Sequence, residues 1–343
     1  MQKVDSNKNI LDIFRLVATA QVFLGHCITH FAMTSPPVQA VYFVRGVPIL
    51  FVLCGFLAAM GLQKYQWKDW LVRRAFRIMP GFWAVIAINT VILLLAYSRK
   101  PTLMEGGIYF FTQFFGLNFY TGDWLRQYGT GVPNGVLWTI PVQIQFFVLA
   151  VPIHKLLSKK KLSAGLAFVG LLTALSILCL RLEGVLPQMV TKLIGVTVLP
   201  YLYFLVAGMV GWYHRDAIIP ALKKVKWFVL AAYVLWKLAE NHLVFPHALD
   251  GVMYNTVTTL LMAVLIFSFG FIGKWRMKHD LTYGFYLYHM VFINLAIELG
   301  FVSLVPWWSG LLLLCVICVL TILSAYLSQR FVENPAGILM KRK

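Results

Sequence analysis

Ten apolar runs constrain this chain more than any other feature of its sequence. Each is close to the roughly 20 residues that a helix needs to cross the hydrocarbon of a bilayer, where only helices and closed barrels satisfy their backbone groups. The runs cover approximately residues 10–32, 41–62, 76–97, 135–154, 162–181, 194–213, 227–243, 253–272, 281–301 and 309–330. This pattern predicts an all-α, polytopic bundle of about ten transmembrane helices, with residues 1–343 forming a single transmembrane domain.

The charge content excludes an ordinary soluble protein. Charged residues make up 12% of the chain, whereas a soluble domain carries roughly 25%. The remaining charge is one-sided, with 30 Lys and Arg against 12 Asp and Glu. Most of these cations fall in segments that face the cytoplasm if the N-terminus is cytoplasmic, which is the positive-inside pattern. Both termini are therefore predicted to be cytoplasmic, the lipid bilayer accounts for the basic surface, and no nucleic-acid partner is expected.

The connection at residues 98–134 is unusually long and is predicted to lie on the outer side, partly associated with the membrane. It is rich in glycine and in aromatic residues, among them Tyr109, Phe119, Tyr120, Trp124 and Tyr128. One interpretation is an aromatic belt at the membrane surface. The other is a platform on which a sugar or a lipid-linked glycan stacks.

Ionisable residues inside apolar spans are costly and are therefore functional candidates. In the first span, Arg15 and His26 are 11 residues apart, which returns to nearly the same face of a helix. An Arg suits thioester or phosphate oxygens, and a His suits the role of general base toward a hydroxyl. Alternatively, Arg15 extends to the membrane surface and His26 only packs between helices. His30 continues this face, but no third ligand is evident, so no metal site is expected.

Arg73, Arg74 and Arg77 form a basic cluster at the predicted cytoplasmic start of the third span. Simple positive-inside anchoring explains many such clusters. The more specific alternative is a binding site for nucleotide phosphates, because guanidinium groups bind phosphate with two hydrogen bonds.

Weaker signals follow along the chain. Trp138 precedes two amides, Gln143 and Gln145, which should be buried and paired at membrane depth. Further polar and aromatic residues that could support a site or contact an acceptor are Tyr283, Tyr286, His289 and Glu333.

Taken in order, these segments resemble acyltransferase family 3, the integral-membrane enzymes that O-acylate surface glycans and lipids. LDIFRLVATAQVFLGH is similar to the family's opening LDxLRxxAxxxVxxxH, and RRAFRIMPGFW to its RRxxRIxPxYW. VPILFVLCGFL, LWTIPVQIQFF, LTYGFYLYH and FVENP are similar to four further family motifs. Gln143 departs from the family, which usually has Glu there, so an acidic role does not carry over. Cys54 and Thr282 stand where the family has Ser.

The resemblance implies an O-acyltransferase of the bacterial inner membrane. It would move an acyl group, most simply acetyl, from cytoplasmic acyl-CoA to a hydroxyl of a surface polysaccharide or lipid-linked glycan, such as O-antigen, capsule or exopolysaccharide. Arg15 and His26 would be the signature catalytic pair, and Arg74 and Arg77 would bind donor phosphates with Arg73 beside them. Acyl-CoA would be a co-substrate, and no permanently bound cofactor is expected.

A glycan exporter or flippase is the alternative function, because spans with internal charges and no soluble catalytic domain also fit a transporter. Transporters often contain inverted repeats, and none is evident here. The sequence leaves open which acyl group and which acceptor hydroxyl are used, and whether transfer is direct or passes through an acyl-enzyme. It also leaves open whether the chain forms a homo-oligomer.

Overall fold

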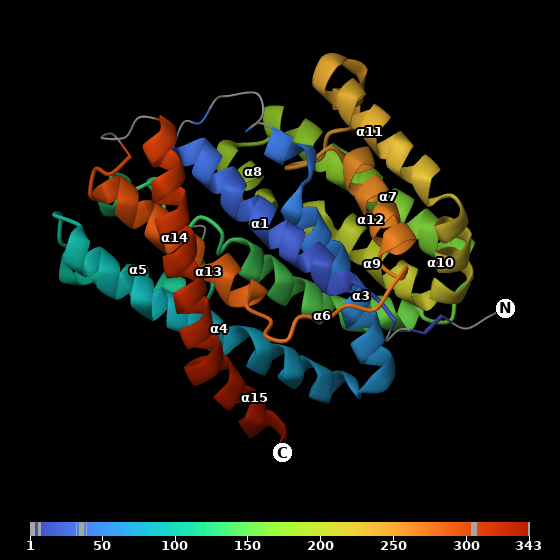
Figure 1. The fold of residues 1–343 in the computed structure, drawn as a ribbon, viewed down its shortest axis with the longest axis horizontal. Coiled ribbons are helices and arrows are strands. Elements are labelled where there is room, and N and C mark those ends of the chain that lie inside the picture. Colours follow the sequence, from blue (N-terminus) through green and yellow to red (C-terminus); the bar gives the residue numbers. More distant parts are fainter. Residues whose placement is uncertain are drawn as a thin grey trace. The chain divides into compact units, whose positions relative to one another are not determined.

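The computed structural model describes residues 4–5, 8–31, 33, 38, 40–118, 120–302 and 307–341. Over these residues the chain is helical, and the one β-bridge, between Asp250 and Asn255, is isolated. The helices group into two compact units, which are described separately (Figure 1). Unit 1 comprises Met1–Ala18, Phe43–Trp70 and Val142–Lys278; unit 2 comprises Thr19–Tyr42, Leu71–Pro141 and His279–Lys343.

Each unit contains its own set of helices. Unit 1 holds α3 (Gly46–Lys64), α7 (Leu162–Arg181), α8 (Gln188–Gly195), α9 (Leu202–Tyr213), α10 (Arg215–Lys224), α11 (Lys226–His242), α12 (Thr256–Phe269) and most of α6 (Thr139–Leu157). Unit 2 holds most of α4 (Trp67–Ala96), with α5 (Leu103–Phe114), α13 (Thr282–Glu298), α14 (Trp307–Ser328), the π-helical turn η6 (Gln329–Glu333) and α15 (Asn334–Lys341). The unit boundary falls within α1 (Leu11–His30).

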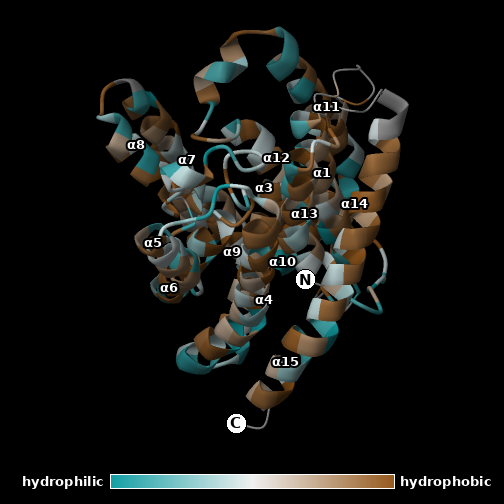
Figure 2. Ribbon diagram, turned by 90° about the vertical axis from the view of Figure 1, so that its left-hand side faces the viewer, coloured by the Kyte–Doolittle hydropathy of each residue, from teal (hydrophilic) through white to brown (hydrophobic). Residues whose placement is uncertain are grey.

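The predicted helical class is confirmed, and a helix lies in each of the ten expected spans. Among the described residues, six helical segments are long and apolar enough to cross a membrane, or seven when α8 and α9, bent by 50°, are taken as one broken span. Much of α14 is hydrophobic along its length (Figure 2). Helices α11, α12 and α13 have 14 to 17 residues. The number of about ten crossings and the side on which the termini lie stay predictions.

Glycines let α3 and α9 touch backbone to backbone at the centre of unit 1. A Cβ on Gly55 would lie 1.8 Å from the carbonyl oxygen of Leu205, and one on Gly208 would lie 2.1 Å from that of Val52. Small residues at such crossings are the usual means by which membrane helices pack, because lipid supplies no hydrophobic drive between them.

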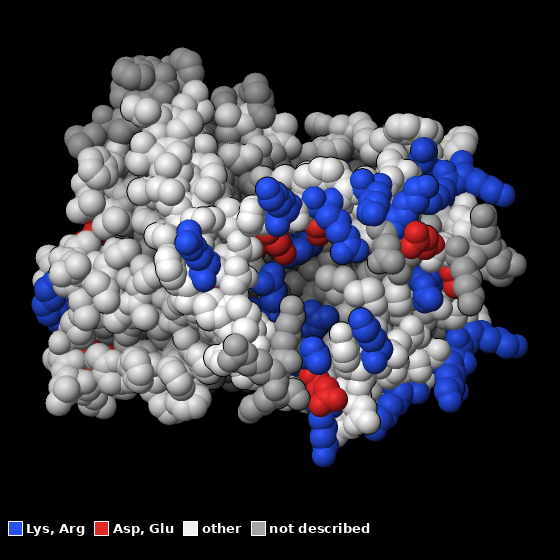
Figure 3. Space-filling view, turned by 60° about the horizontal axis from the view of Figure 1, so that its bottom comes forward, with Lys and Arg blue, Asp and Glu red and all other residues white. Residues whose placement is uncertain are grey.

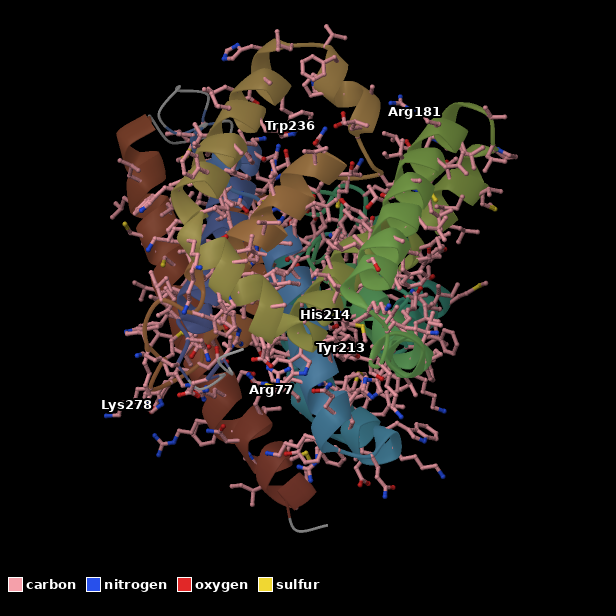
Figure 4. The ribbon with its side chains drawn as sticks, turned by 90° about the vertical axis from the view of Figure 1, so that its right-hand side faces the viewer. Arg77, Arg181, Tyr213, His214, Trp236 and Lys278 are labelled. Carbon is pink, nitrogen blue, oxygen red and sulfur yellow. The ribbon has the colours of Figure 1, made fainter. Side chains whose placement is uncertain are left out.

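Labelled side chains mark the two ends of unit 1. Figure 4 shows Arg181 and Trp236 toward one end of the unit, and Tyr213, His214 and Lys278 toward the other. The N-terminal segment joins the second of these ends, because the backbone N–H of Val4 donates to Asp216 Oδ1 at 2.7 Å. The face of the molecule drawn in Figure 3 carries more Lys and Arg than Asp and Glu side chains.

The long connection at residues 98–134 folds against unit 2. It begins with α5, whose N-terminus carries a capping box between Thr102 and Glu105. Tyr109, Trp124 and Tyr128 are 7%, 2% and 0% exposed and pack with Leu93 and Tyr97. These three rings form a buried aromatic cluster and not an exposed stacking platform. The sequence could not distinguish a buried aromatic cluster from an exposed stacking platform, because both need the same aromatic residues. Tyr120 is 49% exposed, and Phe119 lies outside the described residues.

Asn294 fastens the end of this connection to α13. Its fully buried amide accepts from the N–H of Thr130 at 2.8 Å and donates to the carbonyls of Val132 and Pro133 at 2.9 and 2.8 Å. Gly129, with φ of +52°, lies against it where a Cβ would be 2.4 Å from Asn294 Oδ1. The segment that leads into α6 is therefore held by a satisfied polar clamp.

Candidate functional site

Three histidines meet in unit 2. His26 and His30 are one turn apart on α1, with ring centroids 5.8 Å apart and planes only 4° from parallel. His289 on α13 contacts His26 from a different helix, at a centroid distance of 5.4 Å and a tilt of 40°. His289 is fully buried and His26 is half-buried. The sequence singled out all three residues but gave no reason to expect His289 beside His26.

Aromatic side chains line this histidine cluster. Phe23, one turn before His26, packs edge-on against Phe285 and His289 at 5.3 and 6.0 Å. Tyr286 packs edge-on against His289 at 6.1 Å, while its hydroxyl lies 3.1 Å from Thr139 Oγ1. The imidazoles therefore sit among apolar surfaces, where hydrogen bonds and charges act more strongly than in water.

Arg77 is held by two carboxylates in the same unit. Its Nη1 lies 3.4 Å from Glu333 Oε2, and its Nη2 lies 3.3 Å from Asp280 Oδ2. The Glu333 side chain is 3% exposed and also accepts from Ser328 Oγ at 3.3 Å, whereas the Arg77 side chain is 43% exposed. We call these three residues the Arg77 clasp. It joins α4 to the start of α13 and to the end of η6.

Tyr283 completes the surroundings of the clasp. Its hydroxyl donates to the carbonyl of Ile78 at 2.7 Å, and its ring lies 6.0 Å from the Arg77 guanidinium carbon. Gly81 makes room for this ring, because a Cβ there would lie 2.9 Å from Tyr283 Cε1. The four sequence candidates Arg77, Tyr283, His289 and Glu333 thus belong to one unit.

The structure does not bring every candidate into unit 2. Arg15 lies on α1, as predicted, but in unit 1, where its Nη1 is 3.4 Å from Asp12 Oδ1. Asp12 Oδ2 in turn accepts from the backbone N–H of Met277 at 3.2 Å. Arg15 and His26 share a helix, and their cooperation in one reaction stays a prediction.

The two amides near the start of α6 also belong to unit 1. Gln145 accepts from the N–H of Val198 at 2.9 Å and donates to the carbonyl of Val196 at 3.2 Å, so the prediction that it is paired is confirmed. Gln143 is half-buried. Trp138, half-buried in unit 2, ends the connection that leads into α6.

Arg73 and Arg74 lie half-buried on α4, one turn before Arg77. A guanidinium shared between two carboxylates, as in Arg77, has less attraction left for an anion. Sequence reasoning missed Asp280 and Ser328. The only signal for Asp280 was an acidic residue just before an apolar span, and Ser328 gave none.

Two hollows open on unit 2. An apolar cavity of about 340 Å³ is lined by ten side chains of α13, of the turn that follows it and of α14. Among them are Phe292, Leu295, Leu312 and Val316. A smaller one of about 190 Å³, at α5 and the connection after it, includes Glu105, Tyr120 and Asp123. Hydrogen bonds from Thr102, together with the charge of Arg99, hold the pKa of Glu105 below its usual value.

A family profile described as an acyltransferase domain matches residues 8–330. The chain belongs to acyltransferase family 3. The match spans both units, and the histidine cluster and most of the Arg77 clasp fall inside it. Glu333 lies just beyond its end. The resemblance noted from the sequence motifs is thereby confirmed.

Two relatives of this acyltransferase are similar over most of its length. "Nodulation protein 10" of Rhizobium leguminosarum bv. viciae is 25% identical over 352 residues, covering 96% of this chain and 93% of its own. The "Putative peptidoglycan O-acetyltransferase YrhL" of Bacillus subtilis (strain 168) is 24% identical over 320 residues, covering 84% of this chain and half of its own. No solved structure matches the chain. With its apolar helices and its family, the protein is an integral-membrane O-acyltransferase.

Proposed function

We propose that this acyltransferase transfers an acyl group, most simply acetyl, from a cytoplasmic acyl-CoA to a hydroxyl of a surface polysaccharide or lipid-linked glycan at the bacterial inner membrane. The observation that carries the proposal is His26, an imidazole inside a membrane helix that contacts a second, fully buried imidazole. The family profile over residues 8–330 favours group transfer over the alternative of glycan export. The second relative's name, which describes an O-acetyltransferase, supports an oxygen acceptor.

In the proposed reaction, His26 is the general base. The acceptor hydroxyl gives its proton to an imidazole nitrogen of His26 while its oxygen attacks the thioester carbon. The C–O bond forms, the C–S bond breaks, and the proton passes from His26 to the leaving thiolate, so the products are an O-ester and CoA thiol. Arg15 is proposed to orient the donor or to stabilise the thioester oxygen, since a guanidinium suits a developing negative charge.

The donor end of the site is assigned to the arginines of α4. CoA carries phosphates, which guanidinium groups bind with paired hydrogen bonds. We assign phosphate binding to Arg73, Arg74 and Arg77, of which Arg77 also contacts Asp280 and Glu333. In this assignment Arg77 shapes the site through Tyr283.

The acceptor end is assigned to unit 2. The small hollow at α5 offers carboxylates and the exposed ring of Tyr120, which are groups that hydrogen-bond and stack with sugars. The larger cavity beside α13 is lined only by apolar side chains and suits the hydrocarbon part of a lipid-linked acceptor. Trp138, Gln143 and Gln145 are proposed to support the site from the start of α6.

The test compares the surface glycan of the producing bacterium with and without the gene, and with His26→Ala at equal expression. Base-labile O-acyl esters are counted by NMR. Cys27→Ala is the matched control, because Cys27 is the adjacent, fully buried residue on the same helix. We expect the ester to disappear in the deletion and in His26→Ala and to persist in Cys27→Ala.

Two outcomes would contradict the proposal in different ways. Full acylation in the His26→Ala strain would remove His26 from the chemistry. Loss of the whole glycan from the surface in the deletion strain, and not only of its esters, would favour the exporter. The identity of the transferred group follows from the mass of the acid that mild base releases.

A further inference from the structure

His289 has one ring nitrogen with a partner and one without. Its Nδ1 lies 3.2 Å from the carbonyl oxygen of Phe285, one turn earlier on α13. Its Nε2 is buried and has no hydrogen-bond partner among the described residues. Most buried polar atoms in proteins are paired, and leaving one unpaired is destabilising. This nitrogen therefore calls for an explanation.

The Phe285 contact fixes the form of the His289 ring. A carbonyl oxygen only accepts hydrogen bonds, so the nitrogen facing it must carry the hydrogen. In the neutral imidazole the other nitrogen then has a free lone pair. Nε2 of His289 is consequently a buried acceptor that needs a donor.

Among the described rings that pack on His289, one can serve as this donor. The ring of Phe23 has no polar hydrogen, and the hydroxyl of Tyr286 already lies 3.1 Å from Thr139 Oγ1. His26 remains, with its ring centroid 5.4 Å away. No hydrogen bond joins the two rings in the structure, but at this centroid separation a rotation of the His26 side chain brings a nitrogen of each ring within hydrogen-bond distance. The 40° tilt allows that approach, whereas the near-parallel stacking of His30 on His26 does not, because ring N–H groups point within the ring plane.

We infer that His289 is the positioning residue of the reaction: its Nε2 accepts a hydrogen bond from one ring nitrogen of His26 and so leaves the other His26 nitrogen free to act as base. This inference rests on the proposed function. It deepens that function by assigning to a neutral imidazole the orienting role that a carboxylate fills in Ser-His-Asp triads.

The pair acts through the charge that His26 gains. When His26 takes the proton of the acceptor hydroxyl, both of its nitrogens carry hydrogen and the ring is positive. The hydrogen bond to Nε2 of His289 is then charge-assisted and stronger than in the resting state. His289 neither gains nor loses a proton overall, because the transferred proton leaves His26 for the CoA thiolate. The arrangement thus favours the charged state that exists only during transfer.

The experiment measures acetyl transfer in membrane vesicles of the producing bacterium, with [14C]acetyl-CoA as the donor and base-labile glycan label as the product. His289→Phe removes the acceptor and keeps a ring. We expect kcat to fall about 100-fold, within the range of a lost acid–base contribution, while KM for acetyl-CoA stays unchanged. His289→Gln keeps an acceptor oxygen and should recover activity to within about tenfold of the original protein.

Met290→Leu is the matched control, because Met290 is the adjacent buried residue on α13 and this swap conserves volume. Its kcat should be unchanged. As a measurement independent of activity, 15N NMR of histidine-labelled protein should show Nε2 of His289 without hydrogen but hydrogen-bonded, a signal that His26→Gln alters.

The outcomes separate the inference from the proposed function. Full kcat in His289→Phe, or an Nε2 signal that His26→Gln leaves unchanged, would overturn the inference alone. Failure of the original protein to acylate, or full activity in His26→Ala, would instead overturn the proposed function. A loss in His289→Phe without any recovery in His289→Gln would reduce His289 to a packing role.

Discussion

Replacing Gly55 with alanine should separate the two central helices of unit 1. The added Cβ would lie 1.8 Å from the backbone oxygen of Leu205, where ordinary contact begins at 3.4 Å. The backbone must therefore yield by about half of the ordinary contact distance, because neither atom belongs to a flexible side chain. The matched change Gly170→Ala, on α7, meets nothing within 4 Å.

The cost of Gly55→Ala follows from this geometry. Overpacking a well-packed core costs about 1–3 kcal/mol and occasionally more. Here the backbones also move apart, and a gap of 0.5–1 Å removes roughly a quarter to a half of the van der Waals energy of each remaining contact. We expect unit 1 to lose about 3 kcal/mol, even though alanine gains about 1 kcal/mol of helix propensity over glycine. For folded units of about 150–250 residues, that loss lowers the melting temperature by about 6–12 °C.

The assay is thermal unfolding of the purified protein in one detergent, followed by size-exclusion chromatography of the heated samples. Gly55→Ala should melt several degrees lower than the original protein, Gly208→Ala should do the same, and Gly170→Ala should melt at the same temperature or slightly higher. Equal melting temperatures for Gly55→Ala and Gly170→Ala would refute the backbone contact between α3 and α9.

Three further predictions concern unit 2. Arg77→Met leaves the buried Glu333 without its cation and should lower the free energy of unfolding by about 3 kcal/mol. Glu333→Gln leaves an exposed Arg77 and should lower it by about 1 kcal/mol. The reverse order of the two variants in thermal unfolding would contradict the Arg77 clasp. Asn294→Leu removes three hydrogen bonds and should cost about 2–4 kcal/mol, with faster hydrogen exchange at Thr130 as its local sign. Thr102→Ala should cost about 1 kcal/mol at the N-terminus of α5, seen as faster exchange there and nowhere else.

Sequence alone determined the class of the protein and the position of its helices. Apolar runs and their boundaries are local properties, because each helix satisfies its own backbone wherever lipid surrounds it. For the same reason α7 begins and ends at the predicted residues, Leu162 and Arg181. The order of the motifs also identified the family, whereas the shared role of Arg15 and His26 stays a prediction.

Tertiary structure decided what each candidate contacts. Arg77 finds Asp280 and Glu333 at separations of 203 and 256 residues along the chain. His289 meets His26 across a similarly long separation, and its Nδ1 contacts the carbonyl oxygen of Phe285. A periodic pattern specifies which face of a helix is apolar but not which distant helix covers it, because packing depends on side-chain shapes from both. The family of this protein was therefore predictable from its residues, while the fold set which distant residues they contact.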